Sequence, residues 1–122
     1  EVDKLTASDA AAGDRFGESV GVDGNLAVVG APFDDDPLDS GSVYLYRSTD
    51  GGATWTETTK VTASDAAALD SFGNSVGISG FFVVVGAPLN DLNPFEGNSG
   101  SAYIFSTSDF GTTWAEVDKL TA

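Results

Sequence analysis

The amino-acid sequence predicts an all-β fold made of two similar units of four short antiparallel strands. One observation is an internal repeat: residues 6–22 return as residues 62–78, and each copy continues at the same spacing into Gly-Ala-Pro. A second is composition, because glycine is abundant and Val, Thr, Phe, Tyr and Trp recur in short runs, which favours strands joined by tight turns. A third is that no apolar pattern of helical period continues beyond one turn.

Each copy of the repeat predicts four strands. In the first, Val20 and Val22 alternate with small or polar residues, and Asp23-Gly24 supplies a tight hairpin turn because glycine tolerates positive φ. The next strand is a continuous apolar run, which is typical of a strand buried on both faces. We expect strands in the first copy over 18–22, 26–31, 42–47 and 55–63. We expect strands in the second copy over 75–79, 81–87, 101–106 and 114–122.

Side-chain size increases along each copy. Small residues concentrate in the first two strands, and bulky aromatic residues lie in the third and fourth. A sheet that is crowded near a central axis and open at its rim needs this gradient, so it indicates radially arranged sheets. The alternative is an ordinary meander that contains these glycines by chance.

Phe-Gly followed by Gly-Ala-Pro, present in both copies, resembles the FG-GAP repeat, the blade of integrin-α-like β-propellers. The signature residues are Phe16, Gly17, Gly30, Ala31, Pro32, Phe72, Gly73, Gly86, Ala87 and Pro88. The resemblance covers essentially the whole chain and implies two four-stranded antiparallel β-propeller blades, part of a larger propeller or tandem blade array. The expected boundaries are a fourth strand of a preceding blade at 1–7, one blade at 8–63 and a second blade at 64–122.

A second motif separates the last two strands of each copy. Residues 48–55 read Ser-Thr-Asp-Gly-Gly-Ala-Thr-Trp, and residues 107–114 repeat the pattern with Thr first. It resembles the Asp-box, a hairpin turn of several propeller families. We expect a structural role, since the carboxylate accepts backbone N–H bonds across the turn, Gly supplies an unusual φ and Trp covers the hairpin. The residues in this role are Asp50, Gly52, Trp55, Asp109, Gly111 and Trp114.

The two ends of the chain carry the same seven residues, since 1–7 and 116–122 are identical. Two blades alone would leave two apolar faces exposed, and propellers typically have more blades. We therefore expect further copies of the same repeat as partners, either in one longer polypeptide or as an assembly. The chain is then an excerpt of a repeating array, or its extra strand pairs with a neighbour.

Charge and composition exclude several classes of function. Nineteen acidic residues stand against five basic ones, for a net charge of −14, which disfavours nucleic acid and anionic membranes. Cys and His are absent, so disulfides, thiolate nucleophiles and Cys/His zinc sites are excluded. No stretch is apolar and long enough to insert in a membrane as a helix. The FG-GAP resemblance implies an extracellular or cell-surface protein.

Acidic loops are the candidate metal site. Blade connectivity places the segments before the first strand of each copy beside the loop between its second and third strands. Asp9 and Asp14 should therefore lie near Asp34, Asp35, Asp36 and Asp39. Clustered carboxylates suit Ca²⁺, the expected cofactor if there is one. The candidate ligands are Asp34, Asp35, Asp36, Asp39, Asp91 and Glu96. The alternative is a solvated loop, and the integrin-type calcium loop between the first two strands is missing.

The favoured function is a non-enzymatic extracellular module for adhesion or ligand recognition, with a protein or glycan ligand. A structural subunit that assembles into a filament or array is the alternative. A glycoside hydrolase is the remote third, because only two arginines are present and sialidases use an arginine cluster. The exposed aromatic candidates are Phe33, Phe95 and Phe110. Phe110 replaces Gly51 of the first copy, so we expect selective contacts where the copies differ.

Overall fold

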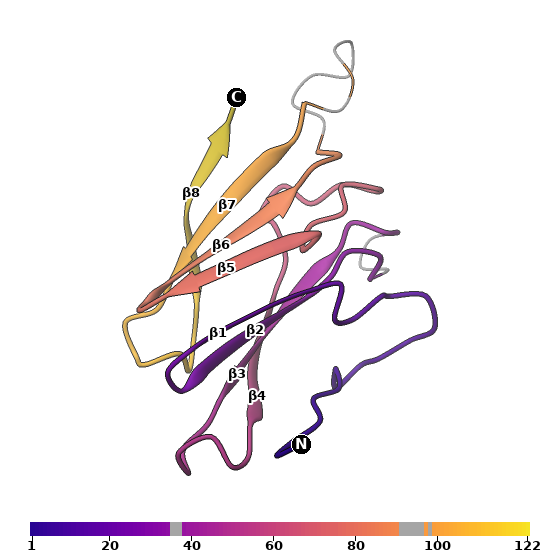
Figure 1. Ribbon diagram of the computed structural model, residues 1–122. Helices are drawn as coiled ribbons and strands as arrows, with labels where there is room; N and C mark the ends of the chain where they lie inside the picture. The colour runs from indigo at the N-terminus through magenta and orange to yellow at the C-terminus, as the bar shows by residue number, and fades with distance from the viewer. Residues whose placement is uncertain (35–37, 91–96, 98) are drawn as a thin grey trace.

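The computed structural model describes residues 1–34, 38–90, 97 and 99–122, which form two four-stranded antiparallel sheets and no helix (Figure 1). Each sheet is a meander in which strands adjacent in sequence are paired. Blade 1 contains β1 (Ser19–Asp23), β2 (Leu26–Ala31), β3 (Ser42–Arg47) and β4 (Thr56–Val61). Blade 2 contains β5 (Ser75–Ser79), β6 (Phe82–Ala87), β7 (Ser101–Ser106) and β8 (Ala115–Thr121). The predicted fold class is confirmed: four strands begin and end where expected, and the other four differ by one or two residues at one or both ends.

The two blades have the same local geometry because they share the same turn chemistry. Asp23 pairs with Leu26 across a two-residue turn in which Gly24 has φ +58°, and Gly80 takes the same place with φ +57°. A register shift interrupts the β3–β4 pairing between Leu45 and Tyr46, and the β7–β8 pairing at the equivalent point. Such bulges increase strand twist, so both blades twist at the same place.

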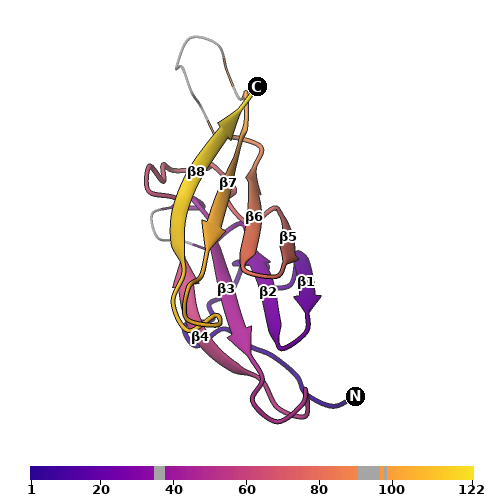
Figure 2. The same cartoon turned by 90° about the vertical axis from the view of Figure 1, so that its left-hand side faces the viewer.

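The main core lies between the blades, where β1 runs beside β5 (Figures 1 and 2). Blade 1 contributes Val28, Val43 and Leu45, which are at most 2 % exposed. Blade 2 contributes an aromatic face, in which Phe72 packs edge-on against Tyr103 with 5.4 Å between the ring centroids. The two faces of a blade therefore differ. In blade 1, β3 directs Val43 and Leu45 towards blade 2 and its two tyrosines to the outer face.

Glycines set how closely the blades approach. A Cβ atom on Gly30 would lie 2.0 Å from the carbonyl oxygen of Gly73 in the next blade. The Ser19 hydroxyl donates a hydrogen bond of 2.7 Å to that same carbonyl. A second contact is the hydrogen bond from Phe72 N–H to the carbonyl oxygen of Ser40, at 2.8 Å. The small residues of the inner strands thus bring one backbone against another, which explains the size gradient of the sequence.

The FG and GAP parts of the signature are joined within each blade. Gly17 N–H donates to the carbonyl of Gly30 at 3.0 Å, and Gly73 N–H donates to that of Gly86 at 3.1 Å. This bond places Phe16 against Tyr44 in blade 1, at 5.4 Å between ring centroids, in the same way that it places the phenylalanine of blade 2. The signature therefore positions an aromatic ring over its own sheet.

Residues 1–7 lie on the outer face of blade 1 without forming a strand. Leu5 and Ala7 pack against the cluster that contains Tyr46, whose hydroxyl donates to the carbonyl of Thr6 at 2.9 Å. Their counterparts 56 residues later, Val61 and Ala63, pack in the same way on blade 2. The assignment of residues 1–7 to a preceding blade remains a prediction.

We expect Gly30→Ala to cost about 2 kcal/mol of stability, because its methyl group would force the two backbones apart. Gly86→Ala is the matched control, since the same atom there meets only the hydroxyl of Ser75 closely. The control should cost less than about 1 kcal/mol. Urea unfolding of both variants measures the difference, and equal costs would contradict the close contact between the blades.

Candidate functional site

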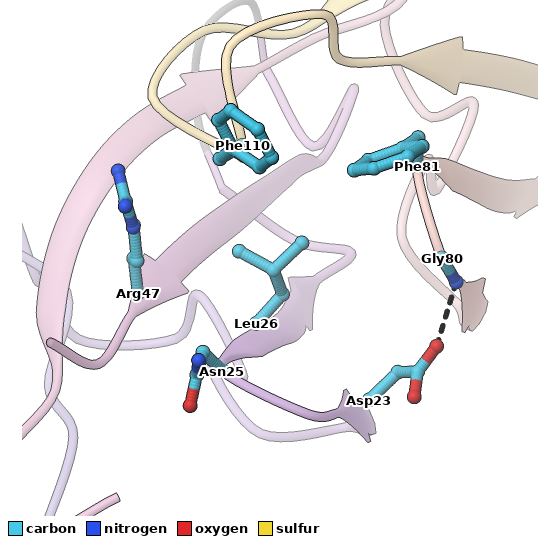
Figure 3. Close-up of a pocket in the computed structure, with 7 residues that line it drawn as sticks. All are labelled: Asp23, Asn25, Leu26, Arg47, Gly80, Phe81 and Phe110. Atoms are coloured by element: carbon cyan, nitrogen blue, oxygen red, sulfur yellow. Dashed lines mark hydrogen bonds between the residues drawn. The ribbon is translucent and has the colours of Figure 1, made fainter. Parts of the chain in front are cut away.

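A cleft of about 320 Å³ opens between the two blades at their hairpin ends (Figure 3). Blade 1 supplies its β1–β2 turn and the end of β3, and blade 2 supplies its β5–β6 turn and its β7–β8 hairpin. The lining residues are Asp23, Asn25, Leu26, Arg47, Gly80, Phe81 and Phe110. Because each wall belongs to a different blade, the cleft exists only where the blades are packed together.

Several contacts between the blades fix the walls of the cleft. The Asp23 carboxylate accepts a hydrogen bond of 2.6 Å from Gly80 N–H, as Figure 3 shows. Arg47 donates to the hydroxyl of Thr112 at 3.3 Å. Leu26 packs so closely on Gly111 that a Cβ atom there would lie 2.3 Å from its side chain. The first contact holds the β5–β6 turn on the edge of blade 1, and the other two hold the β7–β8 hairpin there.

Two phenylalanines form the apolar wall of the cleft. Phe81 is 53 % exposed and Phe110 is 68 % exposed, and their rings meet edge-to-face at 6.1 Å between centroids. Phe110 also has φ +60°, a conformation that costs a non-glycine residue about 1 kcal/mol. Blade 1 has Gly51 at this position, with φ +71°. An exposed aromatic side chain on a strained turn is a feature that folding does not require.

The cleft is also where the two blades differ in sequence. Phe81 and Phe110 stand where blade 1 has Asn25 and Gly51, and Arg47 stands where blade 2 has Ser106. The sequence predicts Phe110 as a contact residue but does not predict Phe81 or Arg47. The replacement of Asn by Phe was the sequence signal for Phe81. Phe33, expected to be exposed, is half-buried beneath Arg15, whose guanidinium lies 4.6 Å from the ring centroid, and Phe95 lies outside the described residues.

The β3–β4 and β7–β8 hairpins are held by the same hydrogen bonds. Asp50 accepts from Thr54 N–H at 2.8 Å, and Trp55 Nε1 donates to the carbonyl of Gly52 at 3.1 Å. Thr54 through its hydroxyl and N–H, together with the Ser48 hydroxyl, lowers the pKa of Asp50 to about 2. The equivalent bonds from Thr113 and Thr107 lower the pKa of Asp109 to about 2. The carboxylates thus act within their own turns.

The opposite edge of blade 1 carries a charge cluster around Lys60. Its ammonium lies 2.6 Å from the Asp9 carboxylate and 3.1 Å from that of Asp34, and the Tyr44 hydroxyl lies 2.7 Å from both carboxylates. Bonds to Lys60 and then to Tyr44 lower the pKa of Asp9. Burial lowers the pKa of Lys60, but its two carboxylate partners outweigh this effect and raise it. The predicted proximity of Asp9 and Asp34 is confirmed, with a lysine between them.

Blade 2 repeats only part of this cluster. Lys119 pairs with Asp65, which also accepts a hydrogen bond of 2.7 Å from the Tyr103 hydroxyl. Asn90 replaces Asp34 and donates instead to Asp70 at 2.9 Å. Burial, and then the bond to Asp65, raises the pKa of Tyr103. The lysine of blade 2 therefore pairs with one carboxylate, whereas the lysine of blade 1 pairs with two.

The calcium site remains a prediction. Within the part of the chain that the structure describes, no three acidic side chains are grouped so that they could hold a metal ion. Asp34 faces Lys60 and Tyr44, and the backbone of Asp39 contacts Ser71 of blade 2 at 3.4 Å. The other candidate ligands, Asp35, Asp36, Asp91 and Glu96, lie outside the described residues.

Two antiparallel four-stranded sheets packed face to face, each with an aromatic ring placed by a Phe-Gly turn, define a β-propeller repeat module. A profile of the FG-GAP repeat matches residues 1–46 and 55–105. The chain belongs to the FG-GAP repeat family. A comparison with curated proteins found no match. In the described ranges, no helix is long and apolar enough to cross a membrane.

We expect Lys60→Met to destabilise the protein by about 2 kcal/mol, because it leaves the nearly buried Asp34 carboxylate without its cation. Lys119→Met is the matched control, since its one carboxylate partner, Asp65, is 47 % exposed. The Lys119→Met variant should lose clearly less stability than Lys60→Met. Chemical denaturation of the two variants compares them, and an equal loss would contradict the role assigned to Asp34.

We expect acid to weaken both hairpins. The pKa of Asp50 and Asp109 is about 2 in the folded chain, below the ordinary 3.8, so the unfolded chain binds protons first as the pH falls. Their contribution is present above pH 3.8 and is lost as the pH falls through about 2. In thermal melts, the difference between the wild type and the D50N/D109N double variant should therefore narrow from pH 5 towards pH 2. A constant difference would contradict this assignment.

Proposed function

We propose that the chain is an extracellular, non-enzymatic recognition module whose binding surface is the cleft between the blades. The observation that carries this proposal is the pair Phe81 and Phe110, more than half exposed beside Arg47. Aromatic residues and arginine are enriched at binding hot spots. The two phenylalanines stand where blade 1 has Asn25 and Gly51, so the repeat itself does not need them.

The lining indicates the chemistry of the ligand. The two rings offer an apolar surface to a protein side chain or to the CH face of a sugar, and Arg47 offers donors to a carboxylate or hydroxyl group. With a net charge of −14, the rest of the chain repels acidic partners at a distance. This favours a largely apolar or neutral ligand, a protein or a glycan, that brings one acceptor group to Arg47.

Binding rather than catalysis agrees with the polar groups of the cleft. Among its described lining residues, Asp23 is the one carboxylate, and it accepts the hydrogen bond from Gly80. Glycoside hydrolysis ordinarily needs two carboxylates across the bond that is cleaved. FG-GAP repeats occur in extracellular and cell-surface proteins, which supports the proposed location. The proposal includes a calcium requirement for binding, with the ion held at the acidic loops.

The test uses the double variant F81N/F110G, which gives blade 2 the residues of blade 1 and removes the steric cost of the positive φ at position 110. The probes are an array of extracellular-matrix proteins and a glycan array. Binding by the wild type and a loss of about tenfold or more in the variant, with unchanged folding, would support the proposal. Each array is read with Ca²⁺ and with chelator, and loss of signal in chelator would support a calcium requirement.

The control variant is Leu69→Gly. Leu69 is also exposed, at 56 %, and also has positive φ, and blade 1 has Gly13 in its place. It lies outside the cleft, so its replacement should leave binding unchanged. Equal binding by F81N/F110G and wild type, or no binding by the wild type on either array, would contradict the proposed site.

A further inference from the structure

We propose that the outer face of blade 2 docks onto the outer face of blade 1 in a second copy of this chain, head to tail. The contact repeats the one already present between blades 1 and 2. This inference is independent of the cleft, because it concerns the two outward faces of the blade pair. It commits to one partner, a second copy, since each outer face is a counterpart of a face buried inside the chain.

The outer face of blade 2 has the residues of a buried interface but is open. Val28 of blade 1 is fully buried against blade 2, whereas its counterpart Val84 is 40 % exposed. Val61 is 7 % exposed, whereas its counterpart Leu120 is 47 % exposed. Contiguous apolar surface on a sheet face marks an interaction site. In blade 1, the equivalent face is covered by the aromatic face of blade 2.

The outer face of blade 1 offers the matching surface. In blade 2, Val76 and Ile78 of β5 pack into the core between the blades. Their counterparts Val20 and Val22 in β1 are 68 % and 65 % exposed. The aromatic part of the face is also repeated, since Phe16 packs edge-on against Tyr44 and Tyr46. Blade 1 thus presents outward the kind of face that blade 2 presents to blade 1.

The residues that allow backbone contact are repeated on the same two faces. Gly86 takes the place of Gly30, and Ser75 takes that of Ser19, whose hydroxyl bonds the next blade. Gly17 takes the place of Gly73, the acceptor of that bond, and a Cβ atom on Gly17 would meet nothing within 4 Å. A docked copy would therefore place Ser75 of one chain against the Gly17 carbonyl of the next.

Residues 1–7 explain why docking is an exchange of segments. Leu5 and Ala7 already occupy the place on blade 1 that Val61 and Ala63 occupy on blade 2. The same sequence forms β8, so the incoming chain brings Leu120 and Ala122 to that place. Identical segments make similar contacts, so replacing residues 1–7 of the next copy costs little locally. The net gain comes from the remaining apolar surface, as in other exchanges between identical chains.

The hairpin edge contributes less than it does inside the chain. Thr58 donates to the carbonyl of Gly111 at 2.9 Å across the internal interface, but Val117 stands at the equivalent place in β8. Two chains of net charge −14 also repel each other. Docking should therefore strengthen as salt screens this repulsion, up to about 0.5 M NaCl. A head-to-tail contact closes into a ring, at roughly two to four copies for a propeller, or continues as a filament.

The first experiment is sedimentation velocity of the whole chain over a concentration series at about 0.05 and 0.5 M NaCl. We expect concentration-dependent assembly that increases with salt. Gly86→Ala should weaken it about tenfold or more, because the methyl group meets a backbone carbonyl only in the docked state. V84T/L120T tests the same face with polar side chains, and Leu69→Gly is the control off both faces. Variants should melt near the wild-type temperature.

The second experiment tests the orientation and uses the absence of cysteine from the chain. Inside the chain, a Cβ atom on Gly21 would lie 3.2 Å from the side chain of Ile78. The equivalent pair between copies is Gly77 with Val22, so a Gly77→Cys chain is mixed with a tagged Val22→Cys chain and a short bismaleimide. Head-to-tail docking gives mainly mixed cross-linked dimers. A monomer at every concentration and salt, or like pairs as frequent as mixed ones, would overturn the proposal.

Discussion

The contact of one backbone with another at Gly30 and Gly73 is the constraint on which the rest of the structure depends. Without a side chain at either position, the inner strands of the two blades approach until Ser19 bonds directly to the next blade. This closeness also brings the hairpin ends together, where Leu26 meets Gly111 and the cleft is formed. The position of the cleft is therefore a consequence of glycines far from its own lining.

Charge is the second constraint, because the chain has five basic residues for nineteen acidic ones. The chain places Lys60 where it contacts two carboxylates at once, one of them nearly buried. Other acids are held by neutral donors instead, as Asp50 is by the hydroxyl and N–H of Thr54. Backbone and hydroxyl donors can stabilise a carboxylate without a counter-ion, so the blades tolerate a large negative charge.

The sequence was sufficient for the parts of the fold that depend on local chemistry. Alternation and turn residues placed all eight described strands, since Gly24 and Gly80 determine their hairpins wherever they occur. The partners across space were harder to predict. Lys60 lies 26 residues from Asp34, and an interpretation of the acidic loops alone did not include it. Phe81 and Arg47 line the same cleft only because the two blades pack together, and the pattern of a single strand does not predict that packing.

Comparison of the two blades separates two kinds of position. Ser19 and Ser75, or Gly30 and Gly86, are identical although only the first of each pair touches another blade in this chain. Within blade 2, a Cβ atom at Gly86 would meet the hydroxyl oxygen of Ser75 at 2.3 Å, although strand interiors ordinarily disfavour glycine. The proposed docking of a second copy would give Gly86 a further role, as the counterpart of Gly30. Apart from Gly80, whose counterpart is Gly24, the positions that line the cleft differ between the blades, such as Phe110 against Gly51. Shared residues therefore serve the stacking of blades, and the differing ones are free to serve a ligand.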